Sequence, residues 1–182
     1  IIRFAYKNKY ILFDSFEYRK IGKSQQIVVA RETFDDNEYW KIVYFLRFWS
    51  SKKNNNDNEI RIRRLMIKDM FFTATNTYLR LGELVNLKWK DILSYENIID
   101  KIGHHQTLVT IRVRAETSKV RRERIITVRG GNYLRRWYKH TKYKDDNDFI
   151  FTNHGGNNHI NQKEIYSSWK EIMIGSGIDY KN

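Results

Sequence analysis

The chain has 182 residues, which suits one sizeable domain with a fragment of a second. Its 34 Lys and Arg against 21 Asp and Glu give a formal net charge of +13, which indicates a polyanionic partner, nucleic acid before an anionic membrane surface. The absence of Cys excludes disulfides and cysteine-based metal or nucleophilic sites. The sequence has no apolar run of membrane-spanning length and no signal-peptide pattern, so we expect a cytoplasmic location without membrane contact.

The first half of the chain is expected to be helical. Residues 1–13 are partly apolar at helical spacing. A second helix is expected to begin at Thr33 as N-cap, with Asp35 and Asp36 in its first turn, where carboxylates favour the positive helix end. We expect its apolar and aromatic side chains to lie in the core: Tyr39, Trp40, Val43, Tyr44, Leu46 and Phe48. Residues 51–58 form a polar loop, and a long helix follows that includes residues 65–72.

Residues 73–92 carry the most informative pattern. Leu79, Leu84 and Leu87 recur at helical spacing up to Ile92, which predicts a helix with one buried face. Arg80 and Glu83 lie three residues apart and therefore on one side of that helix. An exposed ion pair of this kind contributes only about 0.2–0.5 kcal/mol, so spacing alone does not assign it a function.

The second half predicts a small sheet followed by helices. Residues 107–114 and 124–129 alternate β-forming and polar side chains and are separated by a polar turn, residues 115–123, which indicates an antiparallel hairpin. A short helix is expected over residues 132–140, and a final helix that Asn161 caps and that ends near Gly175. The expected fold class is therefore mainly α with a small antiparallel β-sheet.

The sequence pattern of residues 73–92 resembles the first arginine box of the tyrosine recombinase (phage integrase) family. The pattern T-x-L-R-x-G-E-L-x-x-L-x-W-x-D-I is carried by Thr77, Leu79, Arg80, Gly82, Glu83, Leu84, Leu87, Trp89, Asp91 and Ile92. The resemblance implies that Arg80 contacts the scissile phosphate of double-stranded DNA and that Glu83 holds Arg80 in place. The family usually has Gly where Tyr78 stands here. If that position requires a positive φ, Tyr78 is strained and displaces Arg80 slightly.

The expected hairpin turn and the first residue after it carry a cluster of cations: Lys119, Arg121, Arg122 and Arg124. They form either a solvated loop or a phosphate clamp. The family places a catalytic lysine in a T-x-K setting at this turn, and Thr117-Ser118-Lys119 matches it. The resemblance implies that Lys119 is the general acid for the leaving 5′ oxygen, a role for which an arginine holds its proton too tightly. The expected DNA-binding residues are Arg80, Lys88, Lys119, Arg121 and Arg122.

The resemblance also implies a domain organisation. Residues 1–13 would end a helical core-binding domain, residues 14–30 would link the domains, and residues 31–182 would form the N-terminal portion of the catalytic domain. The family needs no metal or nucleotide cofactor, because lysine and arginine stabilise the phosphate during formation of a 3′-phosphotyrosine link. Family members act as tetramers on paired DNA sites.

No H-x-x-R motif, the family's second box, occurs in the 182 residues, and Tyr180 precedes the place where this box is expected. We therefore expect the nucleophile to lie outside this chain, and a monomer that binds DNA without cleaving it. The alternatives are a non-catalytic DNA-binding protein derived from a decayed integrase and a basic RNA-binding protein of unrelated fold, which would expose aromatic side chains for base stacking. The five His residues are not spaced as zinc ligands, so no metal site is expected.

Overall fold

The computed structural model describes residues 6–10, 33–100 and 102–178, and it divides the chain into two units, Ile1–Phe34 and Asp35–Asn182. In the first unit, residues 6–10 form a single turn in which the Lys9 N–H donates to the Tyr6 carbonyl. The expected remainder of a core-binding domain (1–13) and the linker (14–30) lie largely outside the described residues. Those domain assignments stay predictions.

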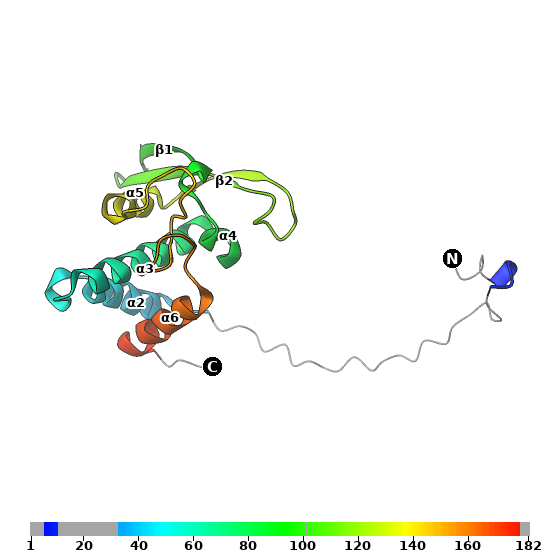
Figure 1. Cartoon of the computed structure of the whole chain (residues 1–182). Coiled ribbons are helices and arrows are strands. Elements are labelled where there is room, and N and C mark those ends of the chain that lie inside the picture. The colour runs from blue at the N-terminus through cyan, green and yellow to red at the C-terminus, as the bar shows by residue number, and fades with distance from the viewer. Residues whose placement is uncertain (1–5, 11–32, 101, 179–182) are drawn as a thin grey trace. The chain divides into compact units, whose positions relative to one another are not determined.

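Three helices form one side of the second unit (Figure 1). They are α2 (Asp36–Trp49), α3 (Asn58–Thr77) and α6 (Gln162–Gly175), and α2 packs against both of the others. Asn161 caps α6 as predicted. The N-cap of α2 is Asp35 and not Thr33, because the Asp35 side chain accepts the Glu38 N–H while the Glu38 side chain accepts the Asp35 N–H.

The prediction that the aromatic residues of α2 belong to the core is only partly correct. Ile42, Val43, Leu46 and Trp49 are buried against α3 and α6. Trp40, Tyr44 and Phe48 are 49–63% exposed. These three side chains follow one another at intervals of four residues and therefore form a stripe on the solvent side of the helix.

The prediction of one helix over residues 73–92 is wrong. Helix α3 ends at Thr77 because Tyr78 adopts a left-handed backbone conformation (φ 55°, ψ 21°). A short helix α4 (Leu81–Val85) and a 3₁₀ turn η2 (Trp89–Asp91) follow, and strand β1 starts at Ile92. Several short segments each bury apolar side chains of this stretch. Together these side chains produce a periodicity that resembles that of a single helix. The loop expected over residues 51–58 likewise contains a 3₁₀ turn, η1 (Lys52–Asn54).

The sheet has three antiparallel strands in the order β1-β2-β3: β1 (Ile92–Ile99), β2 (His105–Val113) and β3 (Arg124–Arg129). The β2–β3 hairpin confirms the prediction, whereas β1 was not expected and β2 begins two residues earlier than predicted. Central strand β2 buries Val109, Ile111 and Val113. The fold class, mainly α with a small antiparallel sheet, is confirmed.

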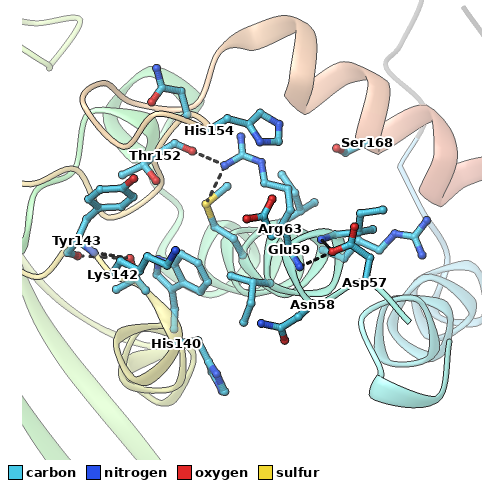
Figure 2. Close-up of a pocket in the computed structure, with 18 of the residues that line it drawn as sticks. Asp57, Asn58, Glu59, Arg63, His140, Lys142, Tyr143, Thr152, His154 and Ser168 are labelled. Atoms are coloured by element: carbon cyan, nitrogen blue, oxygen red, sulfur yellow. Dashed lines mark hydrogen bonds between the residues drawn. The ribbon is translucent and has the colours of Figure 1, made fainter. Parts of the chain in front are cut away.

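Helix α5 (Gly131–His140) joins the sheet to the helical side, since it packs on both β2 and α3 (Figure 1). Buried Asp69 of α3 accepts hydrogen bonds from Arg136 of α5. The Trp137 indole N–H donates to the carbonyl oxygen of Ile150 at 2.6 Å, which fixes α5 to the segment before α6. Arg63 of α3 donates to the carbonyl oxygen of Thr152 in the same segment, beside a pocket (Figure 2). Among the residues that the structure describes, no helix has the length and apolar character needed to cross a membrane.

Candidate functional site

Arg80 stands at the start of α4 with its side chain directed to solvent. Its backbone N–H donates to Glu83 Oε2 at 3.0 Å, and its guanidinium Nη1 lies 3.8 Å from Glu83 Oε1. The Arg80 side chain is 58% exposed, whereas that of Glu83 is 2% exposed. The carboxylate therefore lies beneath the arginine, and the outer edge of the guanidinium is open to a ligand.

A second arginine holds the same carboxylate from the sheet. Arg124, the first residue of β3, donates from Nη1 to Glu83 Oε1 at 2.9 Å and from Nη2 to Oε2 at 2.8 Å. These hydrogen bonds from Arg124, joined by the one from the Arg80 N–H, hold the pKa of Glu83 below its usual value although burial opposes them. The pKa of Arg124 is raised in return by its hydrogen bonds to Glu83. Both groups are therefore charged at neutral pH.

In the sequence, Arg124 stands out only as one member of the cation cluster at the hairpin turn. Its partner lies 41 residues earlier in the chain, and no local pattern connects the two. The sequence shows the cluster of cations over residues 119–124. It does not show which of them binds a carboxylate within the fold and which face solvent.

A third arginine fixes the other end of the turn. Arg114, just after β2, donates from Nη2 to the carbonyl oxygen of Asn86 at 2.6 Å and from Nε to Asp91 Oδ2 at 3.1 Å. The same oxygen of Asp91, which is buried, accepts the Lys88 N–H at 2.9 Å. Residues 114–123, termed here the hairpin loop, are thus attached at both ends to the segment that carries Arg80: Arg114 binds Asn86 and Asp91, and Arg124 binds Glu83.

The hairpin loop extends away from the body of the unit on the side where α4 lies (Figure 1). Ser118 is buried within it, and its carbonyl accepts the Arg121 N–H at 2.9 Å. The next residues, Lys119, Arg121 and Arg122, are exposed. Within the described part of the chain, the structure records no ion pair for these three side chains, so their charges are available to an anion.

Two further predicted positions differ in their surroundings. Lys88 is half-buried, and its Nζ lies 4.7 Å from the centre of the Phe149 ring, so part of its side chain is engaged in packing. Its contact with DNA stays a prediction. Tyr78 has the positive φ that was the condition for its strain, and its side chain is 87% exposed. Across residues 6–10, 33–100 and 102–178, no group of three or more His, Asp or Glu side chains is placed to hold a metal ion.

Comparison with known proteins identifies the family and the fold. The sequence profile of the phage integrase family matches residues 46–182, and the chain belongs to this family. Among solved structures, the chain is similar to the XerH site-specific recombinase in a pre-cleavage complex with its difH substrate. The TM-score is 0.51 and the identity 20%, over 82% of this chain and 38% of the recombinase. A post-cleavage complex of XerH with a palindromic difH substrate gives the same TM-score and identity, over 82% of this chain and 37% of the other.

The chain thus spans well under half the length of these recombinases, and the similarity establishes the fold. No curated protein sequence matches the chain. The family membership overturns the alternative of an RNA-binding protein of unrelated fold. Aromatic side chains are exposed on α2, so their burial is no argument against RNA binding; the family membership is what excludes this alternative.

Proposed function

We propose that this chain supplies the phosphate-binding part of a tyrosine recombinase that carries out site-specific DNA recombination in the cytoplasm of a bacterium, encoded there by the host or by a phage. Arg80 binds the scissile phosphate, Lys119 is the general acid, and Glu83 and Arg124 position Arg80. The observation that supports this proposal most strongly is the exposed guanidinium of Arg80 above a buried carboxylate that Arg124 already pairs.

The pairing of Glu83 with Arg124 leaves the positive charge of Arg80 available to a ligand. Glu83 alone would neutralise Arg80, but both of its oxygens accept hydrogen bonds from Arg124 at 2.8–2.9 Å, while the Arg80 guanidinium is 3.8 Å away. The carboxylate therefore orients Arg80 mainly through the backbone N–H. The guanidinium keeps donors for a phosphate, whose oxygens gain negative charge in the transition state and are stabilised by fixed, charged donors.

Lys119 fits the proton-transfer role because its ammonium group can release a proton and a guanidinium cannot. In the proposed step, a tyrosine oxygen attacks the phosphorus, the bond between phosphorus and the 5′ oxygen breaks, and Lys119 donates a proton to that leaving oxygen. Arg121 and Arg122 bind neighbouring phosphates. No metal or nucleotide cofactor takes part in this proposal.

The nucleophilic tyrosine is not assigned to any residue of this chain, since no H-x-x-R motif occurs in it. The 182-residue polypeptide is therefore proposed to bind duplex DNA as a monomer without cleaving it, whereas the full-length recombinase acts as a tetramer on paired sites. A non-catalytic protein derived from a decayed integrase would show the same binding. It would differ in giving no cleavage when the complete protein is supplied with DNA.

The proposal is tested by fluorescence anisotropy with a labelled, mixed-sequence DNA duplex over a series of salt concentrations. We expect the logarithm of the association constant to fall linearly with the logarithm of salt concentration, and Arg80→Ala to reduce the slope by about one. Arg61→Ala is the matched control, because Arg61 lies at the opposite end of α3 and binds Asn58. Wild-type affinity and slope in Arg80→Ala would overturn the proposal.

A further inference from the structure

Tyr78 occupies a backbone conformation that a bulky residue rarely adopts. Its φ of 55° and ψ of 21° place it in the left-handed region, immediately after α3. This conformation is unfavourable for any residue with a Cβ, and at helix ends glycine or asparagine usually occupies it. The turn therefore carries local strain that a glycine would remove.

The rest of the fold does not use the Tyr78 ring. The side chain is 87% exposed, and the structure records no hydrogen bond or ring contact for it in the part of the chain that it describes. Its two neighbours hold the turn instead. Thr77 is buried and donates to the Thr73 carbonyl at 2.8 Å, and Leu79 is buried in the core. The ring is thus held in solvent by a fixed backbone.

The position of the ring relates it to Arg80. Tyr78 and Arg80 are two positions apart in the chain, so their Cα atoms lie at most about 7 Å from each other. Both side chains are exposed, whereas Leu79, the residue between them, is buried. This short separation would allow a DNA strand whose phosphate lies on Arg80 to place its adjoining sugar beside Tyr78.

We propose that Tyr78 is a DNA-contacting residue, whose ring packs on the deoxyribose next to the phosphate that Arg80 binds. This inference rests on the function proposed above. Strained backbone conformations cluster at active sites and ligand-binding segments, so the strain at exposed Tyr78 points to a ligand beside it. Because the contact is with the sugar, it fixes the position of the strand without reading its sequence.

Three substitutions of Tyr78 separate the ring from the backbone. Tyr78→Gly removes both the strain and the ring, so we expect the melting temperature to rise by about 2–4 °C and DNA affinity to fall roughly tenfold. Tyr78→Asn keeps a residue that tolerates the left-handed conformation, and it should lose as much affinity. Tyr78→Phe keeps the ring and should bind like the wild type. The loss should be equal for duplexes of different sequence.

The salt dependence distinguishes this contact from that of Arg80. The slope of log affinity against log salt should be unchanged in Tyr78→Gly, because the ring neutralises no phosphate, whereas Arg80→Ala should reduce it by about one. Tyr44→Ala is the matched control, because Tyr44 is another exposed aromatic residue, 63% exposed on α2. Its affinity for DNA should stay at the wild-type value.

The inference is overturned if Tyr78→Gly and Tyr78→Asn bind DNA as tightly as the wild type, if Tyr78→Phe loses as much as they do, or if Tyr44→Ala loses as much as Tyr78→Gly. These outcomes leave the proposed function standing as long as the wild type binds DNA with a steep salt dependence that Arg80→Ala reduces. A wild type without salt-dependent binding would instead overturn the proposed function itself.

Discussion

Removal of the Glu83 carboxylate should destabilise the protein and loosen the site together. In Glu83→Ala, Arg124 loses two charge-assisted hydrogen bonds of 2.8–2.9 Å, and the Arg80 N–H loses its acceptor at 3.0 Å. Hydrogen bonds to a charged group contribute about 1.5–3 kcal/mol each when buried. Since the Arg124 side chain is 36% exposed and regains water, we expect a net loss of about 2–4 kcal/mol in the free energy of unfolding.

Urea denaturation followed by tryptophan fluorescence measures this loss. A double-mutant cycle isolates the pair: Glu83→Ala, Arg124→Ala and the double variant should show a coupling energy of about 1–3 kcal/mol, because removal of one partner abolishes the interaction of the other. Additive effects of the two substitutions, or a loss below about 0.5 kcal/mol in Glu83→Ala, would refute the inference that this pair ties α4 to β3.

Three further perturbations test the fold and its charges. The pKa of Glu83 is lowered from its ordinary 4.5, so the ionised carboxylate stabilises the fold above that pH, and this stabilisation is lost as the pH falls through the lowered value. The urea midpoints of the wild type and Glu83→Gln should therefore differ near neutrality and converge in acid. A difference that stays constant with pH would contradict this. Gly131→Ala should lower the free energy of unfolding by about 1–3 kcal/mol in urea titrations, because an added Cβ would lie 2.9–3.1 Å from atoms of β2. Gly82→Ala is the control, because an added Cβ there meets open space and should leave the stability unchanged. Equal effects of the two substitutions would contradict the packing described. Trp137→Phe leaves the buried carbonyl of Ile150 without its donor and should lower the melting temperature by an amount that corresponds to about 1–2 kcal/mol, and an unchanged melting temperature would contradict that role.

The elements that the sequence predicted well are those defined by local patterns. Strand β3 was expected at its observed bounds, residues 124–129, because β-forming and polar residues alternate there. Asn161 was identified as the cap of α6 from its residue type and position. The pair of Arg80 and Glu83 was also recognised locally, since the two residues are three apart.

The failures concern features that depend on distant contacts. The break at Tyr78 has no marker in the periodicity of residues 73–92, and strand β1 is stabilised by pairing with β2, as in Tyr95 opposite Val109. The exposure of Tyr44 depends on where α3 and α6 pack against α2. The link from Arg124 to Glu83 joins residues 41 positions apart, so only the folded chain reveals it.

We propose that Arg80 and Lys119 act on one DNA phosphate. A double-mutant cycle on DNA binding tests this claim most directly, with Arg80→Ala, Lys119→Ala and the double variant compared by anisotropy at the same salt concentration. If both side chains bind one phosphate, the double variant should lose less free energy of binding than the sum of the two single losses. Losses that add, or an absence of loss in either single variant, would contradict the claim.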